Sequence, residues 1–259
     1  MSFIEEIKIR ARKDIKTIVL PEALDIRILE ATEQVLKENY ANIVLIGNKE
    51  KIEEKAKENN LKIDGAKIVD PENSEKYEEY VDLLYELRKH KGMTKEEASK
   101  LVKDPVYYGM LMVKDEKSNA DGLVSGAIHS TSDTLRPALQ ILKTAPATKL
   151  VSAFFVMVVP DCKYGENGTF IFADSGLNEN PDPEALSEIA ISSSHSFEQL
   201  VKKEPKIAML SYSTYGSAKS ELTNKVIQAT KLVKEKRSDL IVDRWITIRC
   251  CNSTRSCRV

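Results

Sequence analysis

The sequence predicts an α/β protein built around mainly parallel sheet, and three observations carry that prediction. Short β-branched runs alternate with longer amphipathic stretches, as strands alternate with helices. The chain has 259 residues, 42% of them hydrophobic, enough to bury the core of one large domain or two smaller ones. Its apolar runs are no longer than a strand, so we expect no membrane-spanning helix. The formal net charge of −1 and the lack of a basic stripe argue against nucleic acid as a partner.

The first half of the chain shows the alternation most clearly. Thr17–Leu20 and Ile43–Ile46 are β-branched runs, and between them Asp25–Glu38 places its apolar residues along one side. Glu75–His90 repeats apolar residues at helical spacing, and Thr94, with a glutamate three residues later, forms a capping box that begins another helix. The other predicted strands are Lys67–Val69, Gly122–Val124, Ser152–Val159, Thr169–Ala173 and Ile207–Ser211. The other predicted helices are Thr131–Lys143, Pro183–Lys203 and Ser217–Lys236.

The best domain boundary lies at residues 144–148, TAPAT, where Pro146 follows a predicted helix and precedes an apolar strand. We therefore divide the chain into a first α/β domain, residues 1–145, a second, residues 146–243, and a tail, residues 244–259. Residues 1–12 are too charged for a secretory signal, so we expect a cytoplasmic protein.

The tail differs from the rest of the chain. It contains four arginines, no lysine, no acidic residue, three of the four cysteines and the only tryptophan. A metal or disulfide interpretation of Cys250, Cys251 and Cys257 is open, but their spacing matches no established zinc pattern, and we expect no metal site. We favour a reading-frame slip, because codons for this tail, read one base on, can spell the acidic and apolar segment DGLQLDAAIVPEVAE.

The segment Asp121–Arg136, DGLVSGAIHSTSDTLR, is the strongest candidate for a binding site. A predicted strand enters a turn rich in small and hydroxyl-bearing residues, and a helix follows, whose free N–H groups attract an anion. Arg136 lies about one and a half turns along that helix and can add a bidentate cation. The alternative is that the hydroxyls are ordinary caps and Arg136 is a surface residue. The expected anion-site residues are Ser125, Gly126, Ser130, Thr131 and Arg136.

Arginine is rare before residue 244, with 6 arginines against 29 lysines. In so lysine-rich a segment, an arginine indicates a position where the planar guanidinium is needed for bidentate binding. Arg27, Arg88 and Arg136 lie in ordered segments and are the candidates. For Arg27 and Arg88, composition alone leaves a ligand clamp and a salt bridge both open.

Two further segments contain candidate functional residues. In Pro160–Asn178, PDCKYGENGTFIFADSGLN, Cys162 is a candidate nucleophile with His129 or His195 as a distant base, but a lone cysteine near a strand end is more often a packed thiol. Leu210–Glu221 repeats the pattern of strand, hydroxyl-rich turn and helix, with a simple helix cap as its alternative. The two standard glycine-rich nucleotide loops are absent.

Five long segments between about Thr17 and Ser220 carry a family resemblance: VLPEALDIRILEA, YELRKHKGMT, DGLVSGAIHSTSDTLRPALQI, PDCKYGENGTFIFADSGLN and LSYSTYGSA. These segments closely resemble the phosphate acetyltransferase (phosphotransacetylase) family. The resemblance implies two α/β/α domains with the active site in the cleft between them. It implies reversible acetyl transfer between acetyl-CoA and inorganic phosphate, giving acetyl phosphate and CoA, without a metal or prosthetic group. It also implies a homodimer for the intact family.

The resemblance also implies roles for particular residues. Arg88 and Arg136 match arginines on the CoA and phosphate side, and Arg27 is a further carry-over of that kind. Ser130 and Thr131 fall in the loop at the acyl-phosphate pocket. Cys162 matches a cysteine near the CoA site that is not the nucleophile. Such a transfer needs the thiol and the carbonyl held in line, cationic and N–H donors for phosphate and oxyanion, and a base for the thiol.

The sequence departs from the family at one motif. The family's base is an Asp in a C-terminal motif resembling SRGCSxED, which also supplies a Ser and an Arg, and residues 1–259 contain no such motif. The catalytic residues therefore stay unknown. The shifted reading of the tail resembles the family's next segment, so we expect a truncated chain with an incomplete first domain, an exposed apolar sheet face and little or no activity.

Three alternatives stay open. The first is a phosphate butyryltransferase, and the second is a non-catalytic module that binds CoA or another anion. The third, an unrelated nucleotide-binding dehydrogenase, is disfavoured because the glycine fingerprint is missing.

Overall fold

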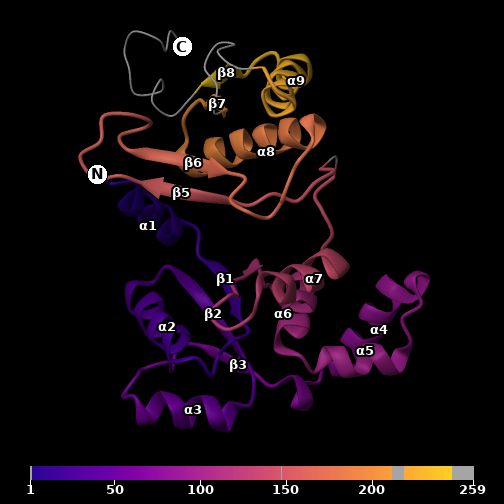
Figure 1. Cartoon of the computed structure of the whole chain (residues 1–259). Helices are drawn as coiled ribbons and strands as arrows, with labels where there is room; N and C mark the ends of the chain where they lie inside the picture. Colours follow the sequence, from indigo (N-terminus) through magenta and orange to yellow (C-terminus); the bar gives the residue numbers. More distant parts are fainter. Residues whose placement is uncertain (1, 147, 212–218, 247–259) are drawn as a thin grey trace. The chain divides into compact units, whose positions relative to one another are not determined.

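The computed structural model describes residues 2–146, 148–211 and 219–246, and it divides into two compact units (Figure 1). One unit comprises residues 4–143, and the other comprises residues 1–3 and 144–259. The division falls after Lys143, whereas the boundary predicted from the sequence follows residue 145.

A four-stranded sheet forms the centre of unit 4–143, and all of its strand pairs are parallel. The strand order is β3-β2-β1-β4, so β1 lies between β2 and β4. The bounds are β1 (Lys16–Leu20), β2 (Ala41–Ile46), β3 (Lys67–Val69) and β4 (Gly122–Leu123). The α/β class and the parallel sheet predicted from the sequence are confirmed in this unit.

Helices cover both faces of the sheet. Alternate side chains of a strand point to opposite faces, so Val19 and Val44 enter a core with α4, α5, α6 and α7, while Leu20 and Leu45 enter a second core with α2 and α3. Burial on both faces explains why these strands are continuous apolar runs in the sequence. The bounds are α1 (Phe3–Lys13), α2 (Ile26–Glu38), α3 (Lys49–Glu58), α4 (Tyr77–Arg88), α5 (Lys95–Val102), α6 (Pro105–Lys114) and α7 (Thr131–Ile141). Short 3₁₀ turns occupy Pro71–Asn73, Lys89–Lys91 and Glu116–Ser118.

Helices α3 and α6 lie in segments where the sequence analysis predicted no element. Helix α6 begins with strong local signals, because the Asp104 side chain accepts from the N–H of Val106 and Tyr107, and Pro105 occupies the first turn. Every residue from Val106 to Met112 is buried, so the helix has no polar face to mark its period.

An apolar groove of about 410 Å³ opens on the α2 side of the sheet. Its lining includes Ile18, Leu20 and Ile43 of the sheet and Val124, which is 56% exposed.

In the other unit, the described strands form two separate pairs. β5 (Phe154–Val158) and β6 (Thr169–Ala173) are antiparallel, which differs from the mainly parallel sheet predicted, and β7 (Lys206–Leu210) and β8 (Ile241–Ile246) are parallel. α8 (Pro183–Val201) and α9 (Glu221–Lys236) pack with the β7–β8 pair around a core that includes Met209, Ala229 and Val242. β8 takes in the first three residues of the tail, and residues 247–259 lie outside the described part of the chain.

None of the helices in the described ranges combines the length and the apolar composition needed to cross a membrane.

Candidate functional site

The carboxyl ends of β1 and β4 lie side by side in the sheet, and the helices that follow these strands lie on opposite faces. Leu29 of α2, which follows β1, belongs to one core, and Ile141 of α7, which follows β4, belongs to the other. In open parallel sheets, ligands bind outside the strand ends at the point where the connections diverge in this way. The loops that leave β1 and β4 are therefore the first place to look for a site.

Glu22, just after β1, organises the loop that follows β4. Its Oε2 accepts from the N–H groups of Gly126 and Ala127 at 2.9 and 2.8 Å, and its Oε1 accepts from those of Ile128 and His129 at 2.8 Å each. The residue is 2% exposed. The backbone donors of residues 126–129 therefore point inward to a carboxylate and are not free for a ligand.

The electrostatics of Glu22 follow from these contacts. Burial alone would raise its pKa, but the N–H donors of Ile128, His129 and Ala127 and the His129 ring outweigh burial and lower the pKa of Glu22 from 4.5 to about 2. An ionised carboxylate only accepts, so the Nδ1 of His129, 2.9 Å from Oε1, carries a proton. The Nε2 of a neutral His129 then carries a lone pair, and it has no partner among the described residues.

Arg27, in the first turn of α2, reaches the same loop. Its guanidinium forms a fork on Asp25, with Nε to Oδ1 at 2.9 Å and Nη2 to Oδ2 at 2.7 Å, and Nη2 also donates to the Ala127 carbonyl at 2.6 Å. The side chain is 63% exposed. Arg27 therefore forms the salt bridge that the sequence left open, and the ligand clamp stays a prediction.

The α7 N-terminus lies directly after the loop. Ser130 is its N-cap and completes a capping box with Asp133, as the hydroxyl-rich turn predicted. The N–H groups of Thr131 and Ser132 have no hydrogen-bond partner within the described part of the chain, as is usual for a first helical turn. The Ser125 hydroxyl is 3.4 Å from that of Thr134. These first-turn amides are the backbone donors left for an anion.

The charges of Arg136 and Arg88 both act on Tyr107 of α6. Burial raises the pKa of Tyr107, and the positive charges of Arg136 and Arg88 both act on it in the opposite direction. Arg136 is exposed on α7 and also helps to lower the pKa of Asp133, although the Ser130 hydrogen bonds contribute more. The Nε of Arg88 is buried without a hydrogen-bond partner among the described residues. Two of the three arginines singled out by composition thus act electrostatically on the same tyrosine.

Cys162 lies in the other unit, in the segment between β5 and β6. It is half-buried, and its Sγ is 3.9 Å from the carbonyl of Tyr164. His195, proposed as a distant base, lies on α8 and contacts Gln199 at 2.9 Å. Most of the hydroxyl-rich turn after β7, residues 212–218, lies outside the described residues.

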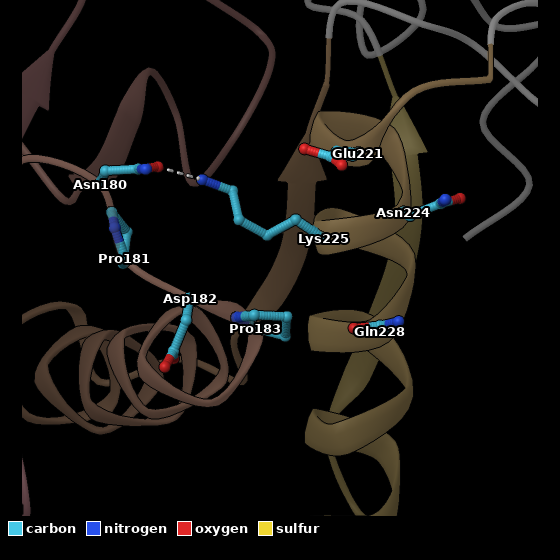
Figure 2. Close-up of a pocket in the computed structure, with 8 residues that line it drawn as sticks. All are labelled: Asn180, Pro181, Asp182, Pro183, Glu221, Asn224, Lys225 and Gln228. Carbon is cyan, nitrogen blue, oxygen red and sulfur yellow. Dashed lines mark hydrogen bonds between the residues drawn. The ribbon is translucent and has the colours of Figure 1, made fainter.

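A polar pocket of about 430 Å³ lies between the start of α8 and α9 (Figure 2). Lys225 reaches from α9 to Asn180, and its Nζ donates to the amide oxygen at 2.9 Å. Among the described residues, no group of three or more His, Cys, Asp or Glu could hold a metal ion. The tail cysteines considered above lie outside those residues.

Sequence reasoning missed two residues of this site, Glu22 and Tyr107. The only local signal for Glu22 is one acidic residue within the apolar run Val19–Leu24 at a predicted strand end. Its partners lie 104 to 107 residues further along the chain, so no local pattern connects them.

Unit 4–143 has an open parallel sheet and, after β4, the N-terminus of α7, the helix that carries Arg136, so it is an α/β unit suited to a phosphate-bearing ligand. The chain belongs to the phosphate acetyl/butaryl transferase family, whose model matches residues 2–246. It is therefore a member of a family of acyltransferase enzymes.

Similar proteins agree with this assignment. The chain is 60% identical over 243 residues to a phosphate acetyltransferase of Acetivibrio thermocellus, covering 94% of this chain and 72% of the relative. It is 50% identical, with the same coverage, to a phosphate acetyltransferase of Clostridium acetobutylicum. Its structure is similar to that of a EutD phosphotransacetylase from Staphylococcus aureus, with a TM-score of 0.84, 37% identity, and coverage of 95% of this chain and 72% of that one.

Proposed function

We propose that the reaction of this chain is the reversible transfer of an acetyl group between acetyl-CoA and inorganic phosphate, giving acetyl phosphate and CoA. Family membership supports acyl transfer to phosphate. The relatives named phosphate acetyltransferase, at 50% and 60% identity, favour acetyl over the longer butyryl group.

The single observation that carries the proposal is the open N-terminus of α7 beside Arg136. The first-turn N–H groups of Thr131 and Ser132 and the Arg136 guanidinium are donors of the kind that bind a phosphoryl group and stabilise a developing oxyanion. The Nε of Arg88 is buried and has no hydrogen-bond partner within the described residues. This unused donor supports a role for Arg88 in holding the phosphate groups of CoA. Arg27 and Cys162 stay candidates for CoA contacts, and Cys162 has no nucleophilic role in the proposal.

The proposed chemistry is a direct transfer. In the direction of acetyl-CoA, the CoA sulfur forms a bond to the carbonyl carbon of acetyl phosphate, and the bond from that carbon to the phosphate oxygen breaks. The thiol proton goes to a base that is not assigned in this chain, and the phosphate leaves with the bonding electron pair. As proposed, the reaction requires no metal or prosthetic group, and CoA enters as a substrate.

The second candidate is a module that binds CoA or another anion without turnover. It is the alternative that the sequence analysis left open. A homodimer and a cytoplasmic location likewise stay predictions.

One assay separates the candidates. Thiol release from acetyl-CoA is measured with and without phosphate, and binding of inorganic phosphate and of CoA is measured in parallel. We expect weak phosphate-dependent thiol release, reduced further in Arg136→Gln and Arg88→Gln but not in Arg237→Gln, whose fork contacts Asp239. CoA binding with no thiol release supports the binding module. Turnover equal to that of the Acetivibrio thermocellus relative contradicts the weak activity predicted from the sequence.

A further inference from the structure

Glu22 is the buried group that determines the conformation of the loop before α7. Between Val124, whose N–H donates to the Val19 carbonyl at 3.0 Å, and the N-cap Ser130, four consecutive N–H groups all donate to this one carboxylate. Four buried donors without an acceptor would be strongly unfavourable. The loop therefore depends on Glu22 for its shape.

The same carboxylate controls what the loop offers to a ligand. Because residues 126–129 donate inward, the amides of Thr131 and Ser132, five and six residues after Gly126, are the loop and first-turn donors that stay free within the described residues. Glu22 also holds Nδ1 of His129, which fixes the imidazole tautomer. A change at Glu22 would therefore move the α7 N-terminus and release the ring together.

We propose that Glu22 is a positioning residue, which holds loop 126–129, the N-terminus of α7 and the His129 ring in the arrangement that receives phosphate. This role rests on the proposed function, because it takes the α7 N-terminus as the phosphate site. Glu22 is buried and acts only through the loop, so it is not a catalytic residue.

Loss of positioning and a purely electrostatic effect change the phosphate affinity in opposite directions. Removing a negative charge close to an anion site would by itself strengthen phosphate binding. Loss of positioning would weaken it, and a merely structural role would lower stability without changing affinity. Glu22→Gln separates these cases, because its amide presents an NH₂ group to backbone N–H donors in either orientation.

The test uses the full chain, with inorganic phosphate as the probe. Hydrogen exchange of the amides of residues 126–129 reports the loop, ring nitrogen shifts report the His129 tautomer, and shifts of the Thr131 and Ser132 amides report phosphate binding. Glu22→Asp keeps the charge but is one methylene shorter, and it replaces Glu22→Gln if the latter does not fold. Thr32→Val is the matched control, since Thr32 is fully buried and donates to the Ile28 carbonyl within α2 at 2.7 Å, away from the loop.

For Glu22→Gln we expect the hydrogen-exchange rates of the loop amides and the dissociation constant for phosphate each to rise about tenfold or more. We expect a smaller rise for Glu22→Asp and none for Thr32→Val. Phosphate affinity equal to or tighter than wild type in Glu22→Gln, or loop amides as protected as in wild type, overturns the positioning role alone. A wild-type chain that binds no phosphate at the Thr131 and Ser132 amides overturns the proposed function together with this role.

Discussion

Two strand-end loops, one in each unit, are organised around a carboxylate, but the two carboxylates reach their donors over different distances along the chain. Glu22 binds four N–H groups more than 100 residues away. Asp174, just after β6, accepts from the N–H groups of Gly176 and Leu177 at 2.9 and 2.8 Å and from the side chain of Asn178. Glu22 is fully buried, whereas Asp174 is half-buried.

Glu22 therefore restrains its loop through tertiary contacts, whereas Asp174 restrains its loop through local contacts. An Asp that binds N–H groups two and three residues on forms an Asx-type turn, which needs only its own segment. The Glu22 contacts form only when β1 and β4 are paired in the sheet, so the loop before α7 takes its shape only in the folded unit. We expect the Glu22 loop to be the more sensitive of the two to changes in its carboxylate.

The largest expected effect is the pH dependence of unit 4–143. The pKa of Glu22 is about 2 in the folded chain against an ordinary value of 4.5, so its stabilisation is present above pH 4.5 and is lost as the pH falls toward 2. The free energy of unfolding should therefore differ between wild type and Glu22→Gln by about 3 kcal/mol at neutral pH, and the difference should shrink through that window. Native-state hydrogen exchange of amides in β1 and β2 measures it.

Glu30→Gln is the control for this titration. Glu30 is exposed on α2, and its neutralisation should change the free energy of unfolding by less than about 0.5 kcal/mol at any pH in the window. A wild-type advantage over Glu22→Gln that stays constant between pH 4.5 and 2 would contradict the electrostatic origin of the effect.

The next effect compares the glycines of the two loops. Gly126 has φ +123° and Gly176 has φ +103°, and no atom lies within 4 Å of a Cβ added at either position. Alanine therefore meets backbone strain without a clash, at about 1–3 kcal/mol in each case. If the loops differ as described, Gly126→Ala should also speed exchange at Ile128 and His129, whereas Gly176→Ala should affect only its own turn. If Gly126→Ala and Gly176→Ala speed amide exchange over equally long segments, the two loops do not differ in the way described.

Much of the fold could be predicted because the signals are local. Continuous β-branched runs revealed the parallel strands of unit 4–143, and the hydroxyl-rich turn at Ser130 marked the start of α7. The sequence analysis missed helix α6 because that helix is buried on all sides. It missed the antiparallel pairing of β5 with β6 because the residues of a strand do not show in which direction the strand pairs.

The candidate site was predictable only in part, for the same physical reason. Arg27, Arg88 and Arg136 stood out because arginine is rare in this chain, and in the folded unit the charges of Arg88 and Arg136 both act on Tyr107. The donors of Gly126 and Ala127 are available or unavailable to a ligand depending on a carboxylate 104 and 105 residues earlier. Local sequence carries no trace of that pairing.

A smaller effect is expected at Asp174. In Asp174→Asn, the Oδ1 atom can still accept from Gly176 and Leu177, and the contact with the Asn178 amide is lost. The expected loss is about 1 kcal/mol, one hydrogen bond, and it should appear in the exchange of the Gly176 and Leu177 amides. A loss as large as that of Glu22→Gln would show that this turn, too, is held by contacts beyond its own segment.

The smallest effect is expected at Arg27, and a matched pair isolates it. Arg27 on Asp25 and Arg237 on Asp239 form the same bidentate fork across two residues, but Arg27 also donates to the Ala127 carbonyl of the loop. Exposed ion pairs contribute little because water and salt screen them. Arg237→Gln should therefore leave loop exchange unchanged, and Arg27→Gln should speed exchange at Ile128 by only about twofold to threefold. An effect at Arg27 that matches Glu22→Gln would mean that the guanidinium, and not the buried carboxylate, holds the loop.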